Sequence, residues 1–308
     1  MKLPREVTAA PAFRALATGV TFHRREFSRR FNLVGTGRVQ CLQGLVSCDV
    51  VNTGGRRHVF GALLTAKGMI VAPLWITLRE AEIVLETPGA AAGPLLETLS
   101  KALPPRLCRV EEITDATTGI GVYGPGAAAA VEGEDLAVPA VARGAQGFDL
   151  VVPAAESGAI LDRLRSRGAV PADESVMAAC RILAGIPALG EEIDDRTLPQ
   201  EVRYEELGAI SYTKGCYLGQ ETVARLHFRG HTNRRLVLLV LDREPAEPPL
   251  EIIHEGKLVG RATSACWSDD LDTWVAQALL RREVEDGAEV RAGEATAVVR
   301  VDRWLRDP

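Results

Sequence analysis

The sequence predicts an α+β fold, with two ferredoxin-like α+β lobes followed by a small antiparallel β-barrel. In the first two hundred residues, apolar runs of strand length and glycine-containing turns are interspersed with amphipathic helical segments. After about Arg235 the pattern changes to short apolar strands spaced by turns, which is typical of a small barrel. We therefore expect an N-terminal lobe at 1–105, a second lobe at 106–234 and the barrel at 235–308.

The first lobe starts without a clear pattern. Residues before about Phe31 are rich in arginine and short of periodicity, so we expect a loosely organised lead with one strand or none. A hairpin bend is expected at Ala66-Lys67-Gly68, where glycine joins two apolar runs. The expected strands are Phe31–Val34, Val59–Thr65, Met69–Leu78 and Ala81–Glu86, and the expected helices are Val39–Cys48 and Pro94–Leu103.

The second lobe contains a formal match to a nucleotide-binding pattern, Gly119-x-Gly121-x-x-Gly124. The glycines lie inside or at the end of a strand and Pro125 follows them, so close packing of backbone explains them better than a dinucleotide. The expected strands are Leu107–Ile113, Gly119–Tyr123 and Phe148–Val152, and the expected helices are Ala127–Val131, Ile160–Gly168 and Asp173–Gly185.

The barrel is predicted from six short strands, several of them joined by glycine turns such as His254-Glu255-Gly256. Its tryptophans are interpreted as packing residues. The expected strands are Leu236–Leu241, Glu251–Ile253, Lys257–Thr263, Trp274–Leu280, Glu289–Arg291 and Thr296–Val301.

Composition limits the function classes. The 308 residues carry a formal charge of −5, which argues against general binding of nucleic acid or anionic membrane. No apolar run is long enough to span a membrane and the start of the chain lacks a secretory signal, so we expect a cytoplasmic protein. The six cysteines are scattered without a Cys-x-x-Cys pair, which predicts neither a disulfide framework nor a metal cage.

The segment 211–235 is the most informative part of the chain. Lys214-Gly215-Cys216 is expected to form a tight bend, because Gly215 can take backbone angles that other residues resist. A short helix should follow from Gly219 to a cap at Gly230. An adjacent ammonium or a helix start lowers the pKa of a thiol, so Cys216 is a candidate reactive thiol tuned by Lys214. The alternative is a small apolar residue beneath a loop.

A basic cluster follows the thiol within a net-acidic chain. Arginine binds carboxylates bidentately, so the cluster could form an anion site, whereas the alternative is a solvated helix face. Nucleic acid is the second choice of anion, and the overall charge and few aromatic residues disfavour it. The cluster consists of Arg225, His227, Arg229, His231, Arg234 and Arg235.

The stretch Lys214-Gly215-Cys216-Tyr217-Leu218-Gly219-Gln220-Glu221, followed by Val223-Ala224-Arg225 and Arg229-Gly230, resembles the signature of the folate-binding YgfZ family. These are iron–sulfur cluster assembly or repair proteins related to the glycine-cleavage T-protein. The resemblance implies a T-protein-like fold and tetrahydrofolate, or a folate derivative, as cofactor. It also implies iron–sulfur assembly machinery or client enzymes as partners, without nucleic acid or membrane.

The resemblance also implies site residues. In related folate enzymes, a glutamate in a Gly-x-Glu setting after a helix holds the pterin; here Glu192 is the candidate and Glu201 the second choice. Arg181 resembles a family arginine, although an arginine at a helix end is also a common packing partner. Cys216 and Lys214 are the expected working residues. Further cofactor contacts are expected from Gly215, Tyr217, Gln220, Glu221, Arg225 and Arg229.

Two functions follow from this resemblance. The first is a tetrahydrofolate-binding accessory protein for iron–sulfur cluster assembly or repair. The second is an enzyme, a folate-dependent one-carbon or aminomethyl transferase of the T-protein type. Such transferases lack the Lys-Gly-Cys signature, and their asparagine-bearing strand has no match in Ile83-Val84-Leu85-Glu86-Thr87, so both features favour the accessory protein.

Overall fold

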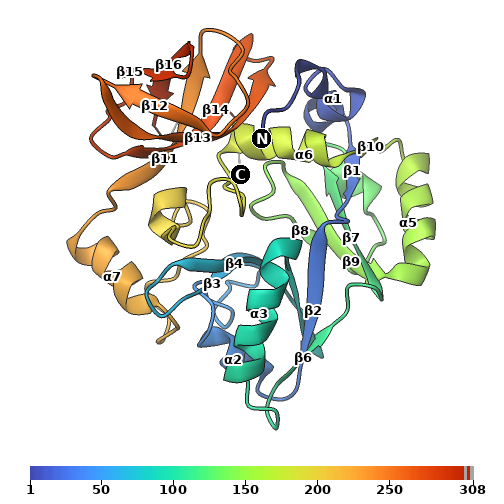
Figure 1. The fold of residues 1–308 in the computed structure, drawn as a ribbon. Coiled ribbons are helices and arrows are strands. Elements are labelled where there is room, and N and C mark those ends of the chain that lie inside the picture. The colour runs from blue at the N-terminus through green and yellow to red at the C-terminus, as the bar shows by residue number, and fades with distance from the viewer. Residues whose placement is uncertain (302–303, 306–308) are drawn as a thin grey trace.

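The computed structural model describes residues 1–301 and 304–305, and it arranges them as two α+β lobes and a closed β-barrel (Figure 1). The predicted fold class is confirmed. The barrel lies against one side of the two lobes, and α6 (Glu174–Ala184) lies between the barrel and the second lobe (Figure 1).

The first lobe is built on an antiparallel sheet with the strand order β3-β4-β5-β2-β6. β3 (His58–Leu64) is buried along its whole length, because its alternate residues enter two different apolar clusters. α3 (Gly89–Ala102) packs on the sheet through Leu95 and Leu99. The other elements are β2 (Ser28–Val34), α2 (Arg38–Gln43), β4 (Ile70–Leu78), β5 (Glu82–Pro88) and β6 (Arg109–Glu112).

The second lobe has the strand order β10-β1-β7-β9-β8, in which only β10 and β1 pair in parallel. α4 (Ala127–Ala130) packs on the sheet through Ala127 and Ala130, and α5 (Ala154–Ser166) packs on it through Ile160 and Leu164. α1 and α6 join a separate apolar cluster that reaches the barrel. The other elements are η1 (Arg5–Val7), α1 (Pro11–Thr18), β1 (Thr21–Arg24), β7 (Thr117–Tyr123), β8 (Val138–Pro139), β9 (Gly147–Pro153) and β10 (Val170–Ala172).

The barrel closes in the order β11-β14-β13-β12-β15-β16, and every pair is antiparallel. Its core is largely aliphatic, with Val237, Ile252 and Val299, and Trp267 and Trp274 pack in the same cluster. The strands are β11 (Arg234–Leu241), β12 (Leu250–His254), β13 (Lys257–Ser268), β14 (Thr273–Arg281), β15 (Glu289–Ala292) and β16 (Ala295–Arg300).

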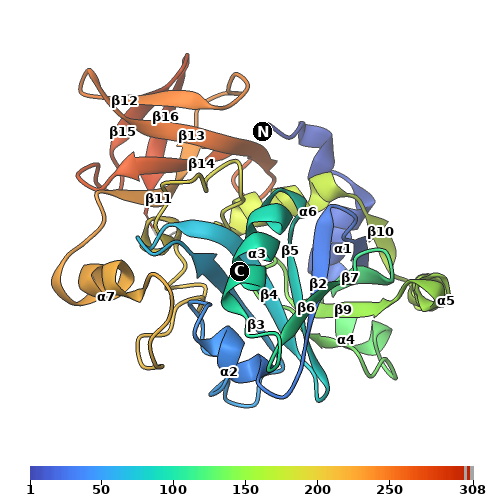
Figure 2. The ribbon, with the colours of Figure 1, turned by 60° about the horizontal axis from the view of Figure 1, so that its bottom comes forward.

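A long connection joins α6 to the barrel and carries the central motif. It contains η2 (Pro199–Val202) and α7 (Gln220–Arg229). α7 is set off to one side of the molecule (Figure 2), and among its residues only Val223 is buried. Most of its surface is therefore open to solvent.

The N-terminal lead differs from its prediction. Instead of a loose segment, residues 11–24 form α1 and β1, because Phe13, Leu16 and Phe22 supply buried apolar side chains. β1 pairs with β7 of the second lobe, while β6 pairs with β2 of the first. The chain thus crosses between the lobes near residue 27 and again near residue 115. The first lobe is the continuous segment between these points, the second lobe is formed from segments on both sides of it, and the expected boundary at residue 105 falls before β6.

The glycine pattern of β7 has a packing explanation. A Cβ on Gly119 would come 2.8 Å from Glu86 Oε2, and one on Gly121 would come 2.1 Å from the hydroxyl oxygen of Tyr123. The two glycines leave room for a buried group of charged side chains between the lobes.

Candidate functional site

The loop that carries the Lys-Gly-Cys motif is fastened to the first lobe by backbone hydrogen bonds. The Ser211 amide donates to the Ser47 carbonyl, and the Leu218 amide donates to the Gly44 carbonyl, at 2.9 and 3.1 Å. Gly219 has a φ of +81°, and a Cβ there would come 2.5 Å from the Thr65 carbonyl oxygen. Only glycine fits this point of closest approach.

Gly215 does not need glycine geometry, contrary to the prediction. Its φ lies outside the left-handed region, and a Cβ at this position would meet no atom within 4 Å. What Gly215 provides is an open surface beside Cys216. Cys216 is exposed, Cys41 is half-buried, and the other four cysteines are buried.

Lys214 contacts the first lobe and makes no described bond to Cys216. Its buried ammonium donates to the carbonyl oxygens of Val46 and Cys48, at 2.7 Å each, and lies 4.8 Å from the ring centre of Tyr217. Burial lowers the pKa of the Lys214 ammonium to about 8. The predicted tuning of the thiol by Lys214 therefore has no contact to support it within the described part of the chain, and the lysine fixes the loop instead.

Tyr217 and Gln220 complete the bend. The ring of Tyr217 is buried in an apolar cluster beneath the loop, and burial raises the pKa of its hydroxyl to about 12. The Tyr217 amide donates to Gln220 Oε1 at 3.1 Å, so the first residue of α7 holds the bend in place. Both side chains thus support the position of Cys216.

The predicted basic cluster divides into two parts. Arg234 donates two hydrogen bonds to Glu201, at 2.9 and 2.8 Å, and Arg235 donates to the Val284 carbonyl, so these two side chains are occupied. Arg225 and Arg229 are exposed on α7 and have no hydrogen bond or ion pair to another described side chain. Glu201, the second pterin candidate, is occupied by Arg234.

His227 and Glu221 also lie on α7. The imidazole of His227 stacks on Tyr212 with ring centres 3.7 Å apart, and its Nδ1 lies 3.0 Å from a carboxylate oxygen of Glu205. Phe228 is 68% exposed and meets both rings edge-on. Glu221 is exposed. The outer surface of α7 is therefore basic and aromatic, and it lies in the same connection as Cys216.

Glu192 is a structural bridge, which corrects its assignment to the pterin. One carboxylate oxygen accepts hydrogen bonds from Arg181 Nη1 and the Ala188 amide, at 2.7 and 2.9 Å. The other oxygen accepts from the hydroxyls of Thr263 and Ser264 in the barrel, at 2.6 Å each. With four donors and almost complete burial, this carboxylate has no free position for a ligand.

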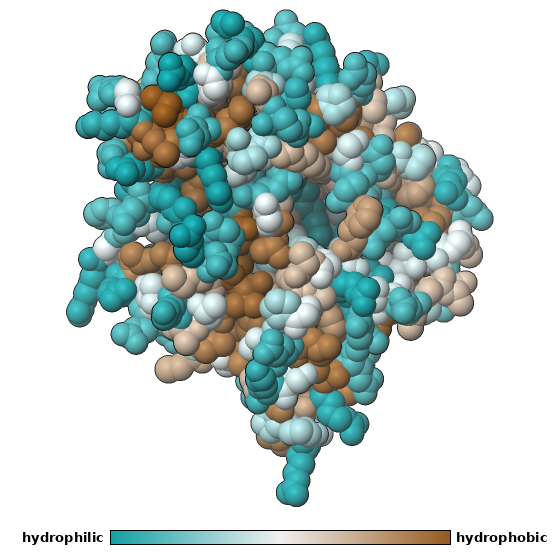
Figure 3. Space-filling model, in the orientation of Figure 1, coloured by the Kyte–Doolittle hydropathy of each residue, from teal (hydrophilic) through white to brown (hydrophobic). Residues whose placement is uncertain are grey.

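A cavity of about 330 Å³, the central cavity, lies among the two lobes and the connection after α6. Figure 3 shows a hollow near the middle of the face drawn, beside α6. Its walls combine apolar and aromatic side chains with a few charged groups, which is the composition of a small-molecule site. Residues lining it include Phe27, Pro73, Trp75, Tyr123, Arg143, Met177, Arg181, Ile186 and Glu191.

Two polar atoms of the cavity wall, Arg181 Nη2 and Glu191 Oε2, form an ion pair with each other and have no hydrogen bond. They lie 3.5 Å apart, and the amino group of Met1 is 3.6 Å from the same Glu191 oxygen. Burial raises the pKa of the Glu191 carboxyl. The sequence analysis identified Arg181 and the acidic loop, but it predicted Glu192 as the pterin ligand, whereas the neighbouring Glu191 lines the cavity.

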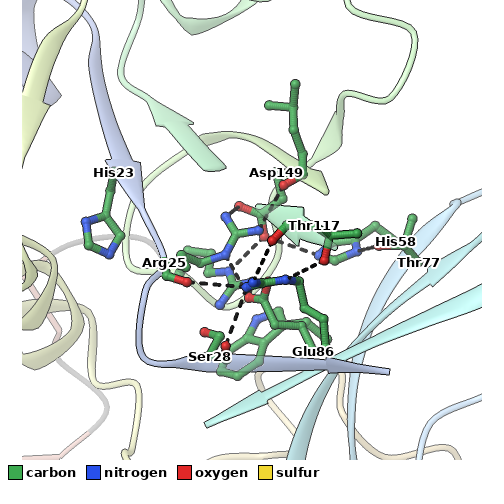
Figure 4. A network of polar contacts seen from close by, with 12 residues as sticks. His23, Arg25, Ser28, His58, Thr77, Glu86, Thr117 and Asp149 are labelled. Atoms are coloured by element: carbon green, nitrogen blue, oxygen red, sulfur yellow. Dashed lines mark hydrogen bonds and ion pairs between the residues drawn. The ribbon is translucent and has the colours of Figure 1, made fainter. Parts of the chain in front are cut away.

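A buried charge network, formed by Arg25, Arg143, Glu86 and Asp149, lies beside the cavity, and its two arginines line the cavity wall. Each arginine contacts both carboxylates, with nitrogen–oxygen distances from 2.6 to 3.0 Å. Figure 4 shows Arg25, Glu86, Asp149 and His58 converging between the lobes, with His23 apart from them. Burial opposes ionisation of Asp149, but the two guanidinium groups hold its pKa well below 3.8. The sequence showed no pattern that would identify this network.

The motif loop and the central cavity are separate places in the molecule. Of the described residues that line the cavity, none comes from 211–235, so Gly215, Tyr217, Gln220, Glu221, Arg225 and Arg229 lie outside it. One apolar cluster contains Tyr217 together with Trp75 and Leu189 of the cavity wall. The cluster thus packs the floor of the motif loop against the wall of the cavity.

A larger open groove of about 950 Å³ runs beside the barrel. Its arginines are largely paired with acids, as with Arg261 and Asp194 at 3.2 Å and Arg281 and Glu283 at 3.5 Å. Because the central cavity is the more enclosed and has buried polar atoms without a hydrogen bond, we take it as the candidate ligand site. Within the described residues, no three His, Cys, Asp or Glu side chains gather as a metal-binding group.

Comparisons with known proteins add to these observations. Residues 234–303 match the family model of the glycine cleavage T-protein C-terminal barrel domain. The chain is 28% identical over 220 residues to a tRNA-modifying protein YgfZ from Colwellia psychrerythraea, covering 68% of each chain. It is 29% identical over 280 residues to a protein of the same name from Yersinia pestis, covering 84% of each.

Among solved structures, the chain is similar to the glycine cleavage system aminomethyltransferase T from Bartonella henselae. The TM-score is 0.75 at 19% identity, over 92% of this chain and 85% of the other. This likeness supports the fold. None of the helices formed by residues 1–301 and 304–305 has the length and apolar character that a membrane crossing requires.

Proposed function

The chain is a YgfZ-family protein related to the T-proteins of glycine cleavage, and from this premise we propose that it binds a reduced folate in its central cavity and uses Cys216 to support the assembly or repair of iron–sulfur clusters. The observation that carries the folate part is the ion pair in the cavity wall between Arg181 Nη2 and Glu191 Oε2, which lie 3.5 Å apart and accept or donate no hydrogen bond. Buried polar atoms are rarely left without a hydrogen bond, so this ion pair points to a polar ligand that supplies one.

The cavity fits a pterin in shape and chemistry. Trp75 and Met177 offer apolar surface for a flat ring system, and a carboxylate suits the donor-rich amino-pyrimidine edge. Glu191 would accept hydrogen bonds from that edge, and Arg181 would donate to a ring acceptor. When bound, a reduced folate supplies an electron-rich ring that can carry a one-carbon unit. The chain's own residues orient it and shield it from water.

The thiol part of the proposal is supported by the surroundings of Cys216. It is the exposed cysteine, on a loop fixed by Lys214 and Gly219 and left open by Gly215. A single thiol cannot hold a cluster that takes four cysteine ligands, so a partner or a second copy would share it. Arg225 and Phe228 on α7 offer the kind of surface, cationic and aromatic, that protein interfaces favour.

The relatives' name, tRNA-modifying protein, is compatible with this proposal. The chain has a net charge of −5, and its exposed arginines beside the barrel are largely paired with acids. Outside α7, such a surface offers few free cations for holding tRNA directly. We therefore propose that the chain affects tRNA modification through iron–sulfur enzymes that it supports.

The aminomethyltransferase alternative is favoured by the T-protein-like fold. Against it, the segment Ile83-Val84-Leu85-Glu86-Thr87 does not match the asparagine-bearing strand of those enzymes. Glu86 is held in the buried charge network, and the Thr87 hydroxyl donates to the Pro73 carbonyl at 2.8 Å. Both side chains are occupied by packing, so the accessory role is the better supported of the two.

The test of the thiol is genetic. In cells that lack the protein, a Cys216→Ser chain should fail to restore iron–sulfur enzyme activity, while Cys41→Ser, a change at a half-buried cysteine, should restore it. Equal rescue by both variants would remove the thiol from the mechanism.

Calorimetry with tetrahydrofolate tests the cavity. We expect saturable binding to the wild-type protein and clear weakening in Glu191→Gln. Incubation with folate and methylamine donors should give no methylene-folate, and multiple turnovers would establish the transferase instead.

A further inference from the structure

Phe27 is an exposed phenylalanine at the opening of the central cavity. It lines the cavity and yet leaves 73% of its surface accessible, the highest value among the large hydrophobic side chains described. A side chain that meets both conditions must lie at the mouth. Exposed aromatic surface at the edge of a pocket commonly marks a contact with a ligand or partner.

The backbone around Phe27 is held on both sides. The Gly89 amide donates to the Phe27 carbonyl and the Arg25 amide donates to the Gly119 carbonyl, at 3.0 Å each. The Arg25 side chain is anchored in the buried charge network, and Ser28 begins β2 opposite Pro88. The ring is therefore displayed from a fixed segment, so ordering it for a ligand costs little conformational entropy.

The size of the cavity determines which part of a ligand reaches this ring. Pockets for drug-sized ligands span roughly 300–1,000 Å³, so a cavity of about 330 Å³ is at the lower limit. With the pterin placed inward against Glu191, the p-aminobenzoyl-glutamate part of a folate must pass through the mouth. The p-aminobenzoyl group is flat and aromatic, and offset stacking is the favoured contact between such rings.

We propose that Phe27 is the platform on which the p-aminobenzoyl ring of a reduced folate stacks, so that this residue gives the site its preference for folates over simple pterins. The inference rests on the proposed function. It assigns Phe27 a binding role only, at a position that the motif resemblance did not include.

The experiment compares two ligands and two matched variants. Tetrahydrofolate contains the p-aminobenzoyl group, and 6-methyltetrahydropterin lacks it. Phe27→Ala should bind tetrahydrofolate roughly tenfold more weakly than wild type, in line with the loss of one aromatic contact, and should bind 6-methyltetrahydropterin equally well. Phe228→Ala removes a similarly exposed phenylalanine from α7, outside the cavity, and should change the affinity for neither ligand.

Each other result overturns the inference in a recognisable way. If wild type binds tetrahydrofolate and Phe27→Ala binds it as tightly, or loses both ligands to the same extent, Phe27 is not a folate platform although the cavity is a folate site. If wild type binds neither ligand, the proposed function fails together with the inference. Phe27→Leu keeps an apolar side chain but lacks the ring, so its affinity for tetrahydrofolate should lie between those of wild type and Phe27→Ala. It also provides a measurement if the alanine variant does not fold.

Discussion

The ammonium of Lys214 lies 2.7 Å from the carbonyl oxygen of Cys48, and this contact joins the motif loop to the first lobe. The two residues are 166 positions apart in the sequence. The lysine of the motif thus fixes where Cys216 is presented, and its effect on the thiol is mainly one of position. The contact also places a charged group in a mostly buried setting, with a consequence for stability.

Lys214 should make the stability of the protein depend on alkaline pH. Its pKa is about 8 in the folded chain against 10.5 for a free lysine, because burial disfavours the charged form. Between these values the unfolded chain binds more protons than the folded one, so the free energy of unfolding rises with pH. The stability advantage of wild type over Lys214→Met should therefore grow between pH 8 and pH 10.5.

Urea denaturation at several pH values measures this advantage. Lys101→Met, at an exposed lysine, corrects for the general loss of one positive charge. A wild-type advantage that stays flat across the range would show that Lys214 is not desolvated in the folded protein.

The two glycines beside Cys216 should respond differently to alanine. Gly219→Ala places a Cβ 2.5 Å from the Thr65 carbonyl oxygen at a positive φ, so we expect a loss of about 2 kcal/mol in the free energy of unfolding. Gly215→Ala meets no atom within 4 Å and should change stability by no more than about 0.5 kcal/mol. Equal losses in the two variants, measured by urea denaturation, would contradict the loop geometry.

The sequence predicted most of the fold because the elements involved are local. Strands β11 and β14 were expected within two residues of their ends, since apolar runs and glycine turns mark them directly. The N-terminal strand β1 was left open and its position was not predicted, because its partners β7 and β10 lie about 100 and 150 residues further on. Short strands that depend on distant partners carry little signal of their own.

The candidate site was predicted only in part, for a similar reason. Cys216 was expected to be exposed because its neighbours in the sequence create the bend, and it is. The choice between Glu191 and Glu192 depends on which carboxylate turns toward Thr263 in the barrel, and adjacent residues of one acidic loop give no indication of that. Phe27 lies in a lead without periodicity.

The buried charge network should lose its contribution to the stability of the protein at low pH. The guanidinium groups of Arg25 and Arg143 hold the pKa of Asp149 well below 3.8, so its contribution is present above that pH and is lost as the pH falls below it. Asp149→Asn would leave two buried arginines with one carboxylate, and we expect a loss of about 3–5 kcal/mol at neutral pH.

The gap in stability between wild type and Asp149→Asn should narrow as the pH is lowered below 3.8. Asp162→Asn, at an exposed surface pair, is the control and should be nearly neutral. A neutral Asp149→Asn variant would indicate that the network contributes nothing to holding the lobes together.

Substitutions at the adjacent residues Glu191 and Glu192 should affect different properties, ligand binding for Glu191 and stability for Glu192. Glu192→Gln removes the charge that Arg181 faces and replaces an acceptor with a donor opposite two hydroxyls, so the melting temperature should fall by several degrees. Glu191→Gln should leave the melting temperature nearly unchanged or slightly raised, because burial already disfavours the ionised form of Glu191.

Tetrahydrofolate binding should depend on the two carboxylates in the opposite way to the melting temperature. Glu191→Gln should weaken tetrahydrofolate binding about tenfold, as the loss of a charge-assisted hydrogen bond would. The pKa of Glu191 is raised above 4.5, so the affinity of the wild-type protein for tetrahydrofolate should already fall before the pH has been lowered to 4.5. The affinity of Glu191→Gln should not show this decrease. A folded Glu192→Gln protein that loses tetrahydrofolate while Glu191→Gln keeps it would return the pterin to Glu192.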